Sequence, residues 1–77
     1  SLSIAPNPFN ASCRIKYSVP SSGALEVVDL SGKNMTSSAI SGSGEFLWKA
    51  DDAPSGVYFV RLRTENNSIQ RKIVLLK

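Results

Sequence analysis

Apolar and polar residues alternate along most of this chain, and the alternating segments are short. The clearest case lies at residues 12–19, where Cys13, Ile15, Tyr17 and Val19 share one parity and polar residues hold the other. Side chains of a β-strand point alternately to its two faces, so this period indicates strands with one buried face. Clusters of Pro, Gly, Ser, Asn and Asp separate the segments, and no segment has helical spacing. The sequence therefore predicts an all-β protein.

The turn clusters divide the chain into seven expected strands: residues 2–5, 12–19, 25–30, 34–40, 46–49, 58–63 and 69–76. Ser31-Gly32 suits a tight hairpin turn between the third and fourth strands, and the polar fourth strand suits the edge of a sheet. Seven short strands of this kind are typical of two packed antiparallel sheets. We therefore predict a seven-stranded antiparallel immunoglobulin-like β-sandwich.

The length of 77 residues leaves room for one domain, residues 1–77. The single cysteine, Cys13, excludes an internal disulfide, and its apolar neighbours of the same parity favour a buried thiol over a reactive one. The chain opens at Ser1 directly into a strand pattern, without an initiator methionine. We therefore expect it to be a piece of a larger protein.

Catalytic chemistry has little support in this sequence. There is no histidine, no Gly-x-Ser-x-Gly elbow and no phosphate-binding loop. A calcium site at Asp51 and Asp52 is disfavoured, because hard cations need about six or more oxygen ligands. Sugar binding on Phe59 and nucleic-acid binding are disfavoured too, since exposed aromatic platforms and aromatics interleaved with basic residues are lacking. We expect no enzyme activity, no metal and no cofactor.

The net charge of +3 is concentrated near the C-terminus. Residues 61–77 hold five basic residues and one acidic residue, a net charge of +4, whereas residues 1–60 carry −1. This asymmetry suits an anionic partner such as nucleic acid or an acidic glycolipid. A solvated strand face, on which Lys and Arg protect a sheet edge, is the alternative that the residues leave open. No apolar run approaches the roughly 20 residues of a membrane span, so we expect no membrane insertion.

Five segments carry motifs that together resemble a known family: Ala5-Pro-Asn-Pro-Phe-Asn10, Ile15-Lys-Tyr-Ser-Val-Pro20, Val27-Val-Asp-Leu-Ser-Gly-Lys33, Pro54-Ser-Gly-Val-Tyr-Phe-Val-Arg-Leu62 and Arg71-Lys-Ile-Val-Leu-Leu-Lys77. In order and spacing they resemble the C-terminal sorting domain of the type IX (Por) secretion system, type A. Immunoglobulin-like domains related to the flagellar hook-assembly protein FlgD are closely similar. The resemblance covers essentially the whole chain.

The resemblance implies a non-catalytic domain that directs an N-terminal cargo in the same chain across the bacterial outer membrane. Its implied partners are the type IX translocon, a sortase-like protease and, after processing, an anionic lipopolysaccharide. The implied route leads through the periplasm to the outer surface or the medium. The alternative is a FlgD-like structural spacer or protein-interaction module without a sorting signal.

The resemblance also assigns roles to residues. The sorting signal would comprise Gly56, Val57, Tyr58, Arg71, Lys72 and Lys77. A second motif is expected to be mainly structural, an edge turn plugged by its phenylalanine: Pro6, Asn7, Pro8, Phe9 and Asn10. Purely structural roles are open for Gly56, in tight backbone geometry, and for Tyr58, in the core. The terminal strand suits strand addition by a partner, because an edge strand presents unpaired backbone groups.

Overall fold

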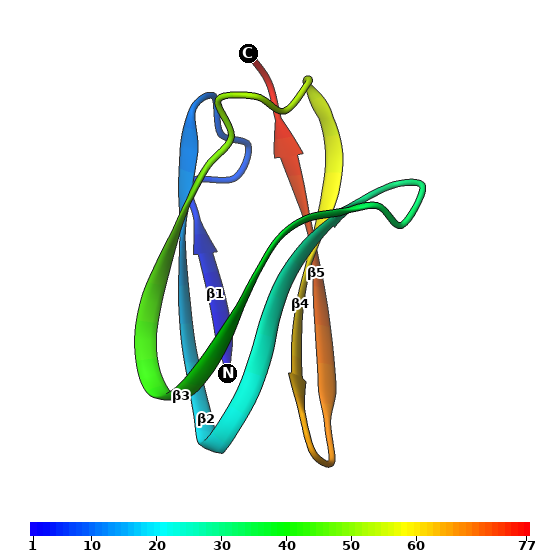
Figure 1. The fold of residues 1–77 in the computed structure, drawn as a ribbon. Helices are drawn as coiled ribbons and strands as arrows, with labels where there is room; N and C mark the ends of the chain where they lie inside the picture. Colours follow the sequence, from blue (N-terminus) through cyan, green and yellow to red (C-terminus); the bar gives the residue numbers. More distant parts are fainter.

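A computed structural model describes all 77 residues, and it contains strands and no helix (Figure 1). It therefore has no helix that is long and apolar enough to cross a membrane. The strands are β1 (Leu2–Ala5), β2 (Ser12–Asp29), β3 (Asn34–Lys49), β4 (Gly56–Thr64) and β5 (Ser68–Leu75). All of them pair antiparallel. The prediction of an all-β antiparallel fold is confirmed.

Strand β2 is the centre of the sheet, because it pairs with three neighbours. Its first part, residues 12–18, pairs with β1 on one side and with residues 43–49 of β3 on the other. Its second part, residues 22–29, pairs with the first part of β3 and with β4. Strand β5 adds to β4, so the order is β1-β2-β4-β5 with β3 beside β2. Figure 1 shows that this single sheet curls into a half-barrel.

The predicted count of seven strands is wrong, and the two separate sheets of a sandwich are not found. The segments predicted as strands at residues 12–19 and 25–30 are one continuous strand, the 18-residue β2. Residues 34–40 and 46–49 likewise belong to one strand, the 16-residue β3. The other three predicted strands correspond to β1, β4 and β5.

The two missing turns are bends that face each other. Ser18 pairs with Ser43 and Ser22 with Ser41, with a register shift between the two pairs. A β-bulge of this kind bends a strand and increases its twist without ending the ladder. Gly42, with φ +63°, supplies the left-handed residue that the bend in β3 needs. The Pro, Ser and Gly residues predicted to end strands therefore curl the sheet instead.

The curled sheet encloses one apolar core of 15 buried residues, and no polar or charged residue is buried. The alternation predicted for residues 12–19 is confirmed, since Cys13, Ile15 and Val19 are buried and Tyr17 is half-buried. Burial raises the pKa of the Cys13 thiol to about 11. The thiol is therefore neutral and packs as a small apolar group, as expected.

Asp29 holds the turn between β2 and β3. Its Oδ1 accepts hydrogen bonds from the Ser31 hydroxyl (2.7 Å) and from the backbone N–H groups of Ser31 and Lys33 (2.9 Å each). Gly32 has φ +89°, which a glycine adopts without steric cost. The expected Ser31-Gly32 turn is thus part of a four-residue connection, residues 30–33. The bonds from Ser31 and Lys33 favour the charged carboxylate and lower the pKa of Asp29.

We expect the substitution Asp29→Asn to make folding stability less dependent on acid pH. A carboxyl group with a lowered folded-state pKa contributes stability above its unfolded pKa, and this contribution is lost as the pH falls through the folded-state pKa. An amide accepts hydrogen bonds but does not titrate. Urea unfolding at about pH 7 and at about pH 2 measures the difference. An equal pH dependence in the wild-type and variant proteins would contradict this role.

Two glycines of β2 and β3 lie where a larger residue has no room. A Cβ at Gly23 would lie 2.5 Å from the backbone oxygen of Arg63, whereas a Cβ at Gly44 would lie 2.6 Å from the Tyr17 hydroxyl. The Arg63 backbone belongs to the β2–β4 ladder, and it moves only if that pairing is disturbed. The Tyr17 ring is half-buried and rotates more easily.

We therefore expect Gly23→Ala to lower the free energy of unfolding by about 1–3 kcal/mol, the usual cost of overpacking. Gly44→Ala serves as the matched control and should cost less, because a side chain rather than backbone must yield. Urea unfolding of both variants tests the difference. Equal losses of unfolding free energy would contradict the expectation that the Arg63 backbone moves less easily than the Tyr17 side chain.

Candidate functional site

The two segments of the expected sorting signal lie side by side. Strand β4 opens with Gly56, whose φ of +157° suits glycine, and continues through Val57 and Tyr58. These three residues pair with Leu75, Val74 and Ile73 of β5, in that order. The fold therefore places the Gly-Val-Tyr segment beside the apolar end of the terminal strand.

Tyr58 is a core residue. Its side chain is 3% exposed, and its hydroxyl donates a hydrogen bond of 2.5 Å to the carbonyl of Pro54. Burial raises the pKa of Tyr58, and the negative charge of Asp29 adds to the rise. Tyr58 therefore packs in the core, and a partner has little of this side chain to contact.

The N-terminal motif, residues 6–10, reaches across to the outer edge of β5 (Figure 1). The Asn7 side chain donates through Nδ2 to the Lys72 carbonyl and accepts through Oδ1 from the Val74 N–H, both at 3.1 Å. One side-chain amide thus supplies the donor and the acceptor that a neighbouring strand would supply. We name these two hydrogen bonds the Asn7 clamp.

Phe9 also bonds to β5, through its backbone. We name the hydrogen bonds of Asn7 and Phe9 to β5 the seam. The Phe9 N–H donates to the Val74 carbonyl at 2.9 Å, and its carbonyl accepts from the Leu76 N–H at 2.8 Å. Phe9 is 3% exposed. Its ring centroid lies 5.6 Å from that of Trp48, and the Trp48 centroid lies 5.2 Å from that of Tyr58. Aromatic pairs of this kind contribute about 0.5–1.5 kcal/mol each beyond their buried area. The Phe9 ring therefore packs in the core.

The C-terminal residue is also held in place. The Lys77 N–H donates to the Ser55 hydroxyl oxygen at 2.9 Å, and Lys77 Nζ donates to the Asp51 carbonyl at 2.8 Å. The Asp51-Asp52 turn is therefore where the chain end docks. No group of three or more His, Cys, Asp or Glu side chains gathers anywhere in the protein in an arrangement that could hold a metal.

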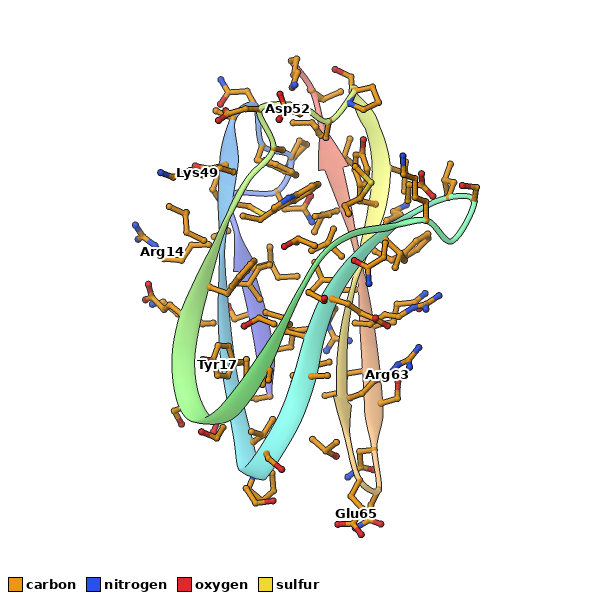
Figure 2. All side chains as sticks on the ribbon, in the orientation of Figure 1. Arg14, Tyr17, Lys49, Asp52, Arg63 and Glu65 are labelled. Carbon is orange, nitrogen blue, oxygen red and sulfur yellow. The ribbon has the colours of Figure 1, made fainter.

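Arg71 and Lys72 are both exposed and lie lower on β5. On the neighbouring strands, Arg61 and Arg63 share one carboxylate, that of Glu26, at 3.7 and 3.1 Å. Arg61 also donates through Nε to Gln70 Oε1 at 3.0 Å. Figure 2 shows Arg63 on this flank, whereas Glu65 lies at the tip of the turn between β4 and β5. Basic side chains thus outnumber carboxylates along the terminal strand.

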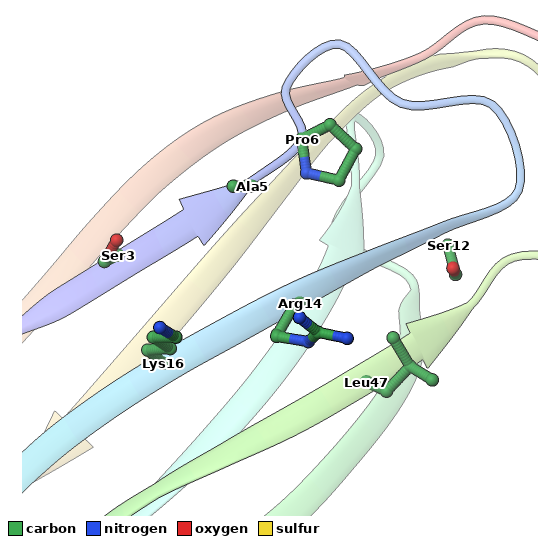
Figure 3. A pocket seen from close by; sticks show the side chains of 7 residues that line it. All are labelled: Ser3, Ala5, Pro6, Ser12, Arg14, Lys16 and Leu47. Atoms are coloured by element: carbon green, nitrogen blue, oxygen red, sulfur yellow. The ribbon is translucent and has the colours of Figure 1, made fainter.

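A separate hollow of about 300 Å³ lies on the outer face of β1, β2 and β3. Figure 3 shows its lining: Ser3, Ala5, Pro6, Ser12, Arg14, Lys16 and Leu47. Arg14 and Lys16 both face Glu45, at 3.3 and 3.9 Å, so their charges are partly neutralised. This lining contains no acid–base pair or activated nucleophile that would perform catalysis.

The sequence did not predict the Asn7 clamp, nor the position of the Trp48 ring between Phe9 and Tyr58. The clamp joins residues that are 65 and 67 positions apart, and local spacing carries no signal for such a contact. The signal that was present is an asparagine between two prolines that cannot join a ladder. A lone polar side chain in such a segment is free to bond elsewhere.

A comparison with known families matches residues 3–76 to the secretion system C-terminal sorting domain. The match spans nearly the whole chain, so this protein belongs to the family of type IX C-terminal sorting domains, as the resemblance indicated. A comparison with curated proteins finds no match. The family is not a catalytic one. Its domains carry a sorting signal, interact with the type IX secretion machinery, and imply export to the cell surface or extracellular space.

We expect Asn7→Ala to lower the free energy of unfolding by about 1–3 kcal/mol, since two hydrogen bonds of about 0.5–1.5 kcal/mol each are lost. The Val74 amide should also exchange with solvent faster. Asn10→Ala is the matched control, because Asn10 is exposed in the same motif and its side chain makes no hydrogen bond. Urea unfolding and amide hydrogen exchange measure both effects, and equal behaviour of the variants would contradict the clamp.

Proposed function

We propose that this domain directs an N-terminal cargo, carried in the same chain, through the periplasm and across the outer membrane by the type IX system. The observation that carries the proposal is the family match over residues 3–76. In this proposal β5 is the part of the signal that the translocon contacts, because Arg71 and Lys72 are exposed there. The contribution of Gly56, Val57 and Tyr58 is indirect, because they pair with β5 and fix its position.

The proposal divides the basic residues of the signal into two kinds. Arg71 and Lys72 present their charge to solvent from the strand. Lys77 instead bonds the Asp51 carbonyl, and it stabilises the chain end until a partner displaces it. Water competes for both groups of an exposed ammonium–carbonyl hydrogen bond, so the net stabilisation by this bond is small. A partner can therefore displace Lys77 from the Asp51 carbonyl.

After export, a sortase-like protease removes the domain, and the cargo is attached to an anionic lipopolysaccharide or released. Before this cleavage, the charge of residues 61–77, +4 in net terms, supports an encounter of the chain with an anionic surface. Attraction between exposed charges decays within about 10 Å at 0.1 M salt, so it favours encounter more than tight binding.

An export assay tests the sorting proposal. A fluorescent reporter is fused in front of residues 1–77 in a bacterium with a working type IX system. We expect Lys72→Glu combined with Lys77→Glu to reduce the surface and medium signal several-fold, because the charge that steers the terminal strand is reversed. Point substitutions are preferable to deleting residues 72–77, which would remove the buried Ile73 and Leu75 and unfold the domain.

Lys33→Glu combined with Lys49→Glu is the matched control, because it makes the same change in net charge at exposed positions outside β5. Circular dichroism establishes that all variants are folded. If both double variants export normally, the basic signal is refuted. If the folded wild-type fusion itself remains in the periplasm, the FlgD-like spacer replaces the sorting function.

A further inference from the structure

The outer edge of β5 is divided into two stretches. The upper stretch is occupied, because the Lys72 carbonyl, both backbone groups of Val74 and the Leu76 N–H bond to Asn7 and Phe9. Backbone groups two residues apart point to the same side of a strand. The N–H groups of Gln70 and Lys72 therefore also point away from β4. We name the backbone of residues 68–72 on this side the open edge.

Neither a proline nor a bulge protects the open edge. The pairing of β4 with β5 runs without interruption from Arg63 and Ser68 to Gly56 and Leu75. Natural sheets disable such edges with prolines, bulges, covering segments or charges. Here the segment at Asn7 and Phe9 covers the upper stretch alone. The lower stretch retains regular strand geometry and the outward N–H groups of Gln70 and Lys72, while the Gln70 carbonyl accepts a hydrogen bond from Arg71 Nη1 at 3.3 Å.

The charge around the open edge is positive. Arg71 and Lys72 are exposed on the strand itself, and Arg61 and Arg63 on β4 remain 33% and 55% exposed at their side chains. The nearby carboxylates are Glu26, whose side chain is 18% exposed between the two β4 arginines, and Glu65 at the tip of the turn before Ser68. Two carboxylates against four basic side chains leave a net positive charge. A strand with acidic side chains complements it.

We infer that the open edge binds an extended acidic segment of a partner protein by strand addition. The inference rests on the proposed function in one respect, that the partner belongs to the secretion machinery. The backbone donors of Gln70 and Lys72 supply the affinity, and the surrounding cations select acidic side chains and set the orientation. The Asn7 clamp and Phe9 set the upper limit of the added strand, since they fill the edge beyond Lys72.

The probe is a synthetic ten-residue peptide that repeats Glu-Val-Glu-Thr, added to the ¹⁵N-labelled 77-residue chain. Binding should shift the backbone amide signals of Gln70 and Lys72 and protect them from hydrogen exchange. The signals of the core strand β2 should change little. Affinity should fall as the salt concentration rises from about 50 to about 500 mM. A peptide with Lys in place of Glu should bind at least about ten-fold more weakly, because its charge repels the edge.

Gln70→Pro separates backbone pairing from charge. Proline is tolerated on an edge strand when its missing N–H faces solvent, as the Gln70 N–H does. We expect this variant to fold and to bind the Glu peptide about ten-fold more weakly, the equivalent of one lost hydrogen bond. Gln70→Ala is the matched control, because it also loses the Arg61 contact but keeps the N–H. It should bind within about two-fold of the wild type.

A second variant tests the charge without a proline. Arg71→Glu combined with Lys72→Glu should reverse the preference, so that the Lys peptide binds better than the Glu peptide. This result does not depend on whether Gln70→Pro folds. An unchanged preference would overturn the inference.

Binding that is insensitive to Gln70→Pro and equally strong for dextran sulfate would also overturn strand addition, since it would reflect charge alone. A failure here is distinguishable from a failure of sorting, because the export assay contains no peptide. A wild-type domain that exports its reporter but binds neither peptide leaves sorting intact and removes strand addition. A domain that binds the Glu peptide through Gln70 but exports nothing keeps the edge site and removes sorting.

Discussion

The fold depends on the seam between the beginning and the end of the chain. A curled sheet that does not close leaves unpaired edge strands and exposes its concave face. Here the segment after β1 crosses to β5, where the side chain of Asn7 and the backbone of Phe9 complete four hydrogen bonds. The Phe9 ring then closes the top of the core against Trp48. Without this seam, Ile73 and Leu75 would lie on an unsupported edge.

The fold class could be predicted because period-two alternation reports directly on burial. Cys13, Ile15 and Val19 are inside as their parity required. The number of strands could not be predicted, because Pro and Gly are typical of turns. Here Pro20 and Gly42 lie instead at bends of two long paired strands. Local sequence reports that the chain departs from a straight strand. Tertiary pairing decides whether the neighbouring strand bends at the same place, so that the ladder continues, or whether the strand ends there.

The candidate site shows the same division. The terminal strand and the Gly-Val-Tyr segment could be placed from their patterns and from the family resemblance, and they do pair in the sheet. The sequence left the role of single residues open. Tyr58 turns inward and Lys77 bonds the Asp51 carbonyl, whereas Arg71 and Lys72 face solvent. Charge and residue type are the same for Lys72 and Lys77, and only the contacts separate them.

The seam also has a consequence for the order of folding. Its hydrogen bonds join residues 65 and 67 positions apart, nearly the full length of the chain. Contacts of such high sequence separation form late, because the loop-closure entropy must be paid before they are made. A chain that lacks its last ten residues has no β5 with which to complete the seam. The seam, and with it the finished fold, therefore forms only once the residues of β5 are present.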